Sequence, residues 1–240
     1  MLFVAVYLSL FSFVYFLGCL VVLFGFKIRG ILPAILLQCS VALAEPVKAP
    51  DHLSSLQGQF QPIVETISKT LMADFERYAS EPESFQVFLD QNVRPYWDPS
   101  STAKALVGST NFKSLNAKAQ TRLTAAVERT FVRYAFEGIA FYNGQKFELV
   151  DVAISDSGKM GWVQVVMRSQ ILPDLNLDIL VKRNKTGIWK AVDVRFKGIT
   201  YVAVKKHGFQ KIMQKQGADA LITSLDVKNN DFFDALKPKK

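Results

Sequence analysis

The chain has 240 residues, of which 29 are Lys or Arg and 21 are Asp or Glu, so its formal net charge is +8. It holds two cysteines and two histidines, and it has neither a Gly-x-Ser-x-Gly motif nor a phosphate-binding glycine loop. This composition argues against metal sites built from Cys and His, nucleotide binding and serine hydrolase chemistry, while the positive charge favours anionic partners such as acidic lipid headgroups.

The N-terminal 44 residues are predicted to be a secretory signal. Lys27 and Arg29 precede an apolar run, and an Ala-x-Ala sequence ends at Ala44, after which we expect cleavage. Residues 1–26 are uncharged and long enough to span a membrane, so an uncleaved anchor is one alternative and a translation start just before Lys27 is another. Both cysteines lie in this segment, so the mature chain is expected to have no disulfide, and its net charge becomes +6.

The mature chain is expected to begin with a linker over residues 45–55, which contains two prolines and polar neighbours. A helix follows, with Pro62 in or near its first turn. Its inward face is marked by apolar residues at helical spacing, namely Ile63, Ile67, Leu71, Phe75 and Tyr78.

Three further helices are predicted before the sheet. Ser80-Glu81-Pro82 indicates a helix with a serine cap and proline in the first turn, and Asp98-Pro99 repeats that signature for a short helix that ends at Gly108. The longest helix is expected from about Asn116 to Tyr142, because apolar residues recur at helical spacing up to the terminating Asn143-Gly144.

After Gly144 the apolar period changes from 3.6 to 2, which predicts four strands: Lys146–Ile154, about 162–168, about 175–182 and Ile188–Phe196. Turns such as Asn184–Gly187 join them, so the sheet is expected to be an antiparallel meander with one apolar face. Helices before and after the strands make this an α+β domain.

The C-terminal part is predicted to pass through Gly198 into a helix, with a second short helix after a break at Gly217. One domain is expected over residues 56–227. Residues 228–240, which end in Lys-Pro-Lys-Lys, are expected to be a basic tail.

Several short motifs occur together in an order that resembles the MlaC family of periplasmic phospholipid carriers, also called toluene-tolerance auxiliary proteins. The motifs are Pro95-Tyr96-Trp97-Asp98 followed by Ala103, Leu106 and Gly108; Gln120 and Leu123; Tyr134-Ala135; Phe141-Tyr142-Asn143-Gly144; and Trp189, Asp193 and Gly198-Ile199-Thr200. The resemblance covers roughly Leu56 to Leu225. Phe112 and Ala218 depart from it, since the family often has Trp at the first position and a larger aliphatic residue at the second.

The resemblance implies a fold like nuclear transport factor 2, in which helices wrap around a curved four-stranded meander and leave an apolar cavity. Phospholipid acyl chains would occupy that cavity, which we expect at the upper end of the usual range of about 300–1,000 Å³. It also implies a monomeric carrier in the periplasm of a Gram-negative bacterium, with no cofactor beyond the carried phospholipid and no nucleic acid partner. Its partners would be an outer-membrane lipoprotein complex and an inner-membrane ABC transporter assembly with an MCE-domain protein, and it would maintain outer-membrane lipid asymmetry.

Candidate lipid-binding residues follow from the inward face of the sheet and from the helices. From the sheet they are Val163, Val165, Met167, Leu177, Ile179, Val181, Val192, Val194 and Phe196, and from the helices and their neighbours they are Tyr96, Phe131, Tyr134, Ile199, Tyr201 and Val202. Each of these residues could equally be an ordinary core residue. The cations Lys182, Arg183, Lys197, Lys205 and Lys206 are candidates for a headgroup or a partner, or are simply solvated.

A secreted serine acyl-transfer enzyme is the alternative hypothesis. Ser101 and Lys104 match the Ser-x-x-Lys motif of penicillin-binding enzymes and β-lactamases, and Lys185-Thr186-Gly187 matches their Lys-Thr-Gly motif. In those enzymes Lys-Thr-Gly lies on a strand beside the active site, whereas here it is expected in a turn. The two histidines, His52 in the linker and His207 on the late helix, have no suitable companions for a metal site.

Overall fold

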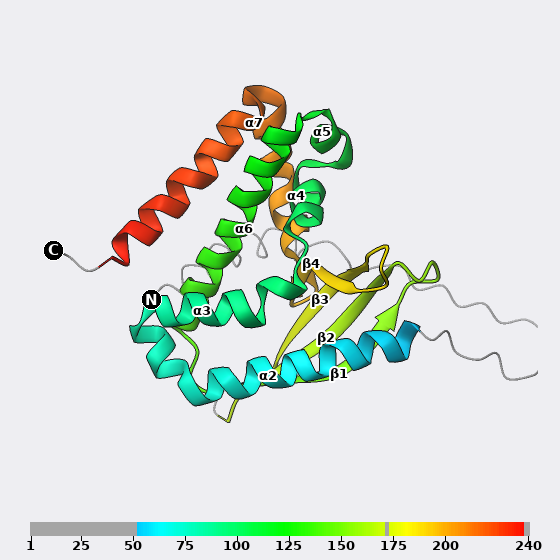
Figure 1. Cartoon of the computed structure of the whole chain (residues 1–240), viewed down its shortest axis with the longest axis vertical. Helices are drawn as coiled ribbons and strands as arrows, with labels where there is room; N and C mark the ends of the chain where they lie inside the picture. The colour runs from blue at the N-terminus through cyan, green and yellow to red at the C-terminus, as the bar shows by residue number, and fades with distance from the viewer. Residues whose placement is uncertain (1–51, 171–172, 238–240) are drawn as a thin grey trace, which may run out of the picture. The chain divides into compact units, whose positions relative to one another are not determined.

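The computed structural model describes residues 52–170 and 173–237, so the expected signal and residues 45–51 of the expected linker lie outside the described residues. The elements are α2 (His52–Ser80), α3 (Pro82–Asn92), the 3-10 turn η1 (Arg94–Tyr96), α4 (Pro99–Val107), α5 (Ser109–Ser114), α6 (Ala117–Ile139), β1 (Lys146–Ile154), β2 (Met160–Arg168), β3 (Leu175–Arg183), β4 (Trp189–Phe196), β5 (Ile199–Thr200) and α7 (Tyr201–Ala235), as Figure 1 shows. The α+β class is confirmed. None of the described helices combines the length and the hydrophobicity that a bilayer-spanning segment needs.

The strands form one antiparallel sheet in the order β1-β2-β3-β4-β5, so each strand pairs with its neighbour in the chain. The four expected strands are present, and the expectation of four is corrected to five by the short strand β5. Lys197 and Gly198 both have positive φ angles, of 47° and 82°, and the turn they make reverses the chain within two residues. Ile199 and Thr200 consequently pair with the end of β4.

Helix α2 lies along one face of the sheet (Figure 1), where it forms the first of three hydrophobic cores. Leu56, Phe60 and Val64 follow one another at intervals of four residues, so they share one side of the helix. They pack against Val163 of β2, Trp189 of β4 and neighbouring side chains of the same sheet face. Polar bonds add to this contact, because the side chain of Gln59 donates to the Trp189 carbonyl at 2.7 Å and accepts from the Trp189 N–H at 3.0 Å.

The other two cores join helices to one another. One lies among α4, α6 and α7, with Leu106, Leu123 and Leu221 fully or almost fully buried. The other brings α2 and α3 against α6 and the end of α7 through aromatic rings. Phe136 of α6, for example, meets Phe233 of α7 edge-on at 5.6 Å between ring centroids.

Several expected boundaries were wrong. Helix α2 begins at His52 rather than after residue 55, so Pro62 lies inside the helix and not in its first turn. Ser80 does not cap α3: its hydroxyl donates back to carbonyls of α2, and Glu81 occupies the cap position. The cap at Asp98 is confirmed, since its carboxylate accepts from the Ser101 N–H at 2.9 Å. Helix α6 ends at Ile139, three residues before Tyr142.

The expected basic tail from residue 228 was also wrong, because α7 continues to Ala235. Asn229 is fully buried, and its side-chain amide donates to the Ala126 carbonyl and to the Thr130 hydroxyl of α6. Packing in the third core, which the sequence pattern of lysines and asparagines does not suggest, extends the helix through Phe232 and Phe233.

The expected break at Gly217 is confirmed, because this residue has φ 84° and ψ 175° inside α7. Only glycine adopts that region without strain, so we expect Gly217→Ala to lower the free energy of unfolding by about 1–3 kcal/mol. A β-carbon would meet nothing within 4 Å, so this cost is conformational rather than a steric clash. Gly208→Ala in the same helix is the control and should stabilise the protein by about 0.5–1 kcal/mol. Urea unfolding measures both, and equal effects of the two changes would contradict the assignment of strain to the bend.

Candidate functional site

One group of apolar side chains on the sheet belongs to none of the hydrophobic cores of the described residues. We call Met167, Leu177, Val194 and Phe196 the sheet patch; all four are half-buried. Leu177 stands opposite Phe196, and Ile179 stands opposite Val194. Directly paired residues point to the same side of a sheet. Leu177 also stands opposite the core residue Val165, so the patch lies on the α2-facing side, next to the core beneath α2.

Aromatic rings from three parts of the chain meet beside the sheet. We call Trp97, Phe131, Tyr134 and Tyr201 the aromatic wall. The Phe131 ring lies 4.7 Å from Trp97 and 4.6 Å from Tyr201 between centroids, and Tyr134 lies 5.8 Å from Tyr201. All four rings are half-buried. Edge-on and tilted contacts of this kind hold the rings in a fixed arrangement.

Strand β4 joins the patch to the wall. The Asp98 N–H donates to the Ala191 carbonyl at 2.8 Å, which brings Trp97 against the strand. The Thr102 hydroxyl donates to the Val192 carbonyl at 2.7 Å and accepts from the Trp97 indole N–H at 2.9 Å. At the end of the strand the chain turns through β5 directly into Tyr201 of α7. The wall is thereby fixed to the strand that carries Val194 and Phe196.

The Tyr201 phenol of the wall is held in its neutral form by its surroundings. Burial raises the pKa of the Tyr201 phenol above its ordinary value, and the neighbouring Tyr134 adds to the rise. An un-ionised phenol presents a largely apolar ring with a single polar tip. The wall therefore suits an apolar ligand much better than one recognised by charge.

Asp193 fixes the first turn of α7 against β4. One of its carboxylate oxygens accepts from the Val194 N–H at 2.8 Å and from the Val202 N–H at 3.2 Å. Burial raises the pKa of the carboxyl above its ordinary value, although these N–H groups act in the opposite direction. These bonds give Asp193 a structural role, because they tie the first turn of α7 to β4.

We expect Asp193→Asn to remove one pH-dependent component of stability. In the unfolded chain an aspartate titrates near pH ~4, and its folded pKa is higher. The stability it contributes is therefore fully present below about pH 4 and is lost as the pH rises through the folded pKa. Asparagine keeps an acceptor oxygen for both N–H groups but cannot ionise. Urea unfolding should show the variant gaining stability relative to the wild type between about pH 4 and pH 7; a constant difference would contradict this.

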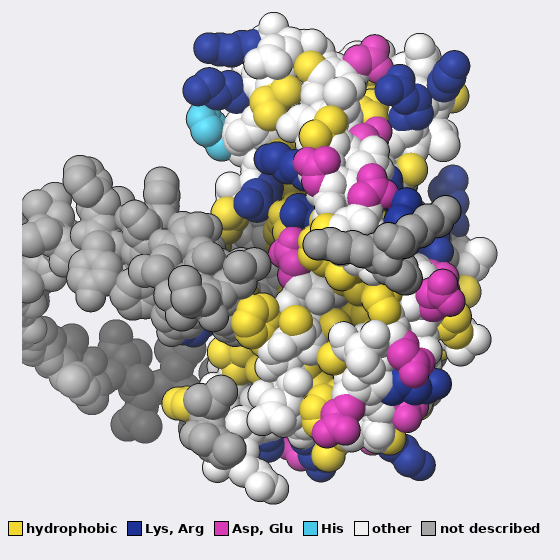
Figure 2. Space-filling model, turned by 90° about the vertical axis from the view of Figure 1, so that its left-hand side faces the viewer, with side chains coloured by type: hydrophobic (Ala, Val, Ile, Leu, Met, Phe, Trp, Pro, Cys, Tyr) yellow, Lys and Arg dark blue, Asp and Glu magenta, His cyan; other side chains and the backbone are white. Residues whose placement is uncertain are grey.

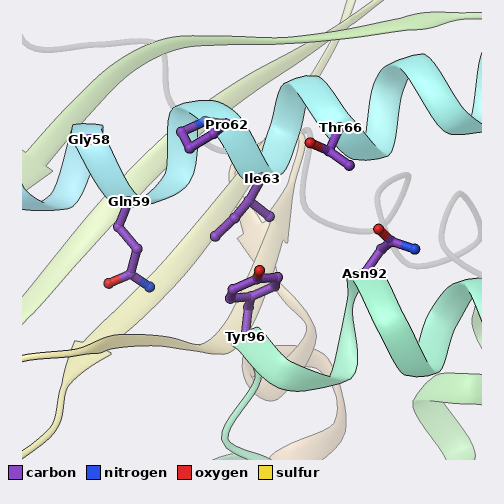
Figure 3. Close-up of a pocket in the computed structure, with 7 residues that line it drawn as sticks. All are labelled: Gly58, Gln59, Pro62, Ile63, Thr66, Asn92 and Tyr96. Atoms are coloured by element: carbon purple, nitrogen blue, oxygen red, sulfur yellow. The ribbon is translucent and has the colours of Figure 1, made fainter.

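A pocket of about 390 Å³ lies between α2 and the segment formed by α3 and η1. Figure 3 shows Gln59, Ile63 and Thr66 of α2 opposite Asn92 and Tyr96, and Gly58 and Pro62 complete its lining. Its volume is at the lower end of the range for ligand sites. This pocket therefore does not meet the expectation of a cavity whose volume lies at the upper end of that range. Of the predicted lining residues, it includes Tyr96.

The structure divides the predicted lining residues into groups. Val163, Val165 and Val181 are core residues beneath α2, and Val192 is buried. Half-buried residues that touch a core are Phe131, Ile179, Tyr201 and Val202, whereas those outside every core of the described residues are Tyr96, Tyr134, Met167, Leu177, Val194 and Phe196. Ile199 is 49% exposed at the turn into α7. Whether any of them contacts a ligand stays a prediction.

Trp97 and six of the seven residues that line the pocket, Ile63 among them, were not among the candidates. Trp97 belongs to the aromatic wall, and Ile63 lines the pocket in Figure 3. Trp97 could have been found, because it adjoins Tyr96 in the motif before α4. Ile63 gives no such signal, since its spacing to Ile67 and Leu71 predicts a core position, whereas the residues of α2 that pack on the sheet are Leu56, Phe60 and Val64.

Among the described residues, Ser101 has no hydrogen bond with Lys104 or with the Lys185-Thr186-Gly187 turn. The Ser101 hydroxyl accepts from the ammonium of Lys182 at 3.0 Å, an exposed contact between α4 and β3. Lys185-Thr186-Gly187 lies in the β3–β4 turn, as expected, where the Asn184 side chain accepts from the Thr186 N–H. His52 contacts Arg183 through its ring nitrogens, and no metal-binding group of three His, Cys, Asp or Glu side chains occurs within residues 52–170 and 173–237.

The chain was compared with known protein families and with solved structures. The sequence model of a family described as MlaC protein matches residues 61–227. Among solved structures, that of the phospholipid-binding protein from Ralstonia solanacearum, in complex with a phospholipid, is similar with a TM-score of 0.65 and 17% sequence identity. The match covers 74% of this chain and 98% of that one, and at this identity it shows a shared fold. No curated protein matches the chain.

Proposed function

The chain belongs to the MlaC family, and from this premise we propose that it is a non-enzymatic carrier of phospholipid. The observation that carries the proposal is the pairing of the sheet patch with the aromatic wall. Both consist of half-buried apolar side chains, and β4 joins them. The solved structure with the same fold holds a phospholipid, which supports the same class of ligand here.

Acyl chains are the part of a phospholipid that such a surface would recognise. Two chains carry roughly thirty methylenes, and burial stabilises each methylene by about 0.8 kcal/mol. Unaided transfer of the lipid through water therefore costs on the order of 20 kcal/mol. A carrier must replace most of this apolar environment. The sheet patch and the wall provide apolar area without burying charge, and Met167 adapts to chains of different shape.

The fold supports this assignment. Helices and a meander that lie around a shared apolar surface fit the expected likeness to nuclear transport factor 2, a fold in which a cavity forms between the sheet and its helices. We place the acyl chains between the α2-facing side of the sheet, at Leu177 and Phe196, and the rings of the wall. The headgroup would remain at the surface, and no cofactor is needed.

The family and the N-terminal signal pattern support a proposal for the place of the carrier in the cell. We propose export to the periplasm of a Gram-negative bacterium and service as the monomeric carrier of an ABC-type lipid transport system. Its docking partners would be an outer-membrane lipoprotein complex and an inner-membrane assembly that contains an MCE-domain protein. Transport between the two membranes would maintain the lipid asymmetry of the outer membrane.

Native mass spectrometry of the protein purified from cells tests the proposal. We expect a bound mass that corresponds to a phospholipid and that is released when the protein is denatured in organic solvent. Incubation with a β-lactam is the matched test of the enzyme alternative and should leave the mass of the chain unchanged. Protein that carries no lipid and is acylated at Ser101 would overturn the proposal.

A further inference from the structure

The first half of α7 carries positively charged side chains and no negatively charged ones. Between Tyr201 and Gln216 the sequence has Lys205, Lys206, Lys211 and Lys215 and no acidic residue. All four lysines are exposed, and none of them takes part in the ion pairs found within the described residues. We call these four lysines with Val204 the cationic stripe.

The helix that carries the stripe is held in place by one of its sides. Phe209, Ile212 and Met213 pack against the core formed with α4 and α6. Lys205 and Lys206 border that side, since they precede Phe209 by four residues and Met213 by seven, respectively. Val204 and Lys211 are separated by seven residues, and Lys215 follows four later, so these three residues share one exposed face. Val204 is 45% exposed on that face, which places an apolar side chain among the ammonium groups.

Further basic residues lie at the end of the molecule toward which the stripe runs. Lys113 is on α5 and Lys118 in the first turn of α6, and both are exposed. Figure 1 shows α5 and the start of α6 beside the bend of α7. Figure 2, which views the left-hand side of Figure 1, shows Lys and Arg side chains toward the upper end of that face and hydrophobic side chains gathered across its middle.

We propose that the cationic stripe docks the protein on the surface of an anionic phospholipid bilayer. A cluster of lysines attracts anionic headgroups, and an exposed apolar side chain among them adds contact at the interface. The stripe contains lysine and no arginine. Lysine is depleted and arginine enriched in specific protein interfaces, whereas a flexible, hydrated point charge suits mobile headgroups, so a lipid surface fits better than an acidic protein.

The position of the stripe connects membrane docking to the candidate site. Lys205 follows Tyr201 of the aromatic wall by four residues, which is one helical turn. A protein held by the stripe would therefore keep the wall near the bilayer surface. This inference goes beyond the carriage of a lipid, because docking requires no lipid inside the protein.

Co-sedimentation with vesicles tests the stripe. The full mature protein is mixed with vesicles of phosphatidylcholine alone or with about one third phosphatidylglycerol. We expect binding to the anionic vesicles only, and its loss as the salt concentration rises, because the Debye length falls to about 3 Å at 1 M. Replacing Lys205, Lys206, Lys211 and Lys215 by glutamine should weaken binding by about fivefold for each lysine, or more than a hundredfold in total.

A matched variant controls for net charge. Replacing Lys69, Lys159, Lys185 and Lys228 by glutamine removes four exposed lysines that lie elsewhere, and it should weaken binding far less. Equal losses in the two variants, or no binding to anionic vesicles at low salt, would overturn the proposal. Stripe-dependent binding to a polyglutamate peptide without vesicle binding would also overturn it, in favour of an acidic protein partner. Native mass spectrometry of the stripe variant reports retained phospholipid separately, so failure here is distinct from failure of the carrier function.

Discussion

Replacing Leu177 with glutamate is expected to deprive the protein of its phospholipid while leaving it folded. Leu177 is half-buried, stands opposite Phe196 and belongs to no hydrophobic core of the described residues. A carboxylate there can reach solvent when the site is free of lipid but would be desolvated against acyl chains, at a cost of several kcal/mol. An affinity loss of at least a hundredfold follows, since 1.36 kcal/mol corresponds to a factor of ten.

The measurement is native mass spectrometry of the purified variant, with circular dichroism and thermal melting to show that it is folded. Asn176→Glu is the matched control, because it adds the same charge one residue away, where an exposed side chain points to the opposite face of β3. We expect that variant to keep its lipid. If the Leu177 variant remains folded with full lipid content, the sheet patch does not contact the ligand.

The choice of Leu177 matters, because neighbouring positions on the same face do not provide the same test. Val165 is 3% exposed and packs beneath α2, so Val165→Glu would bury a charge in the core and unfold the protein. Loss of lipid would then say nothing about contact. Ile179 also touches this core and is a weaker choice for the same reason.

The second prediction concerns stability, which we expect to depend strongly on Trp189. Its side chain is fully buried between α2 and the sheet. Trp189→Ala should lower the free energy of unfolding by about 3–5 kcal/mol, because it removes apolar contacts and leaves a cavity. That is a large part of the about 5–15 kcal/mol available to a typical domain. Urea unfolding provides the measurement.

The variant Trp189→Phe separates the contribution of the ring from that of the indole N–H. Within the described structure the indole N–H of Trp189 is buried without a hydrogen-bond partner, and such a group costs about 1–3 kcal/mol. Phenylalanine keeps much of the ring and removes this donor, so we expect a much smaller loss than with alanine. Equal losses in the two variants would show that ring packing is not what holds α2 to the sheet.

Much of the fold could be read from local patterns. The alternation at Val163, Val165 and Met167 gives a strand, and the cap at Asp98 gives the start of α4, because both signals come from residues close together in sequence. The family was also recognisable from short motifs in order. Local patterns failed at the end of α7, where tertiary packing of Phe232 and Phe233 extends the helix through residues that resemble a polar tail.

The sequence by itself determined that an apolar face runs along the sheet, because period-two alternation records which side each residue faces. Only the tertiary structure decided which part of that face is core and which part is free to meet a ligand. Val163 and Leu177 have the same pattern, yet α2 covers the first and leaves the second half-exposed. The difference depends on what packs opposite each side chain, and the α2 residues that cover Val163 are more than ninety positions away from it in the chain.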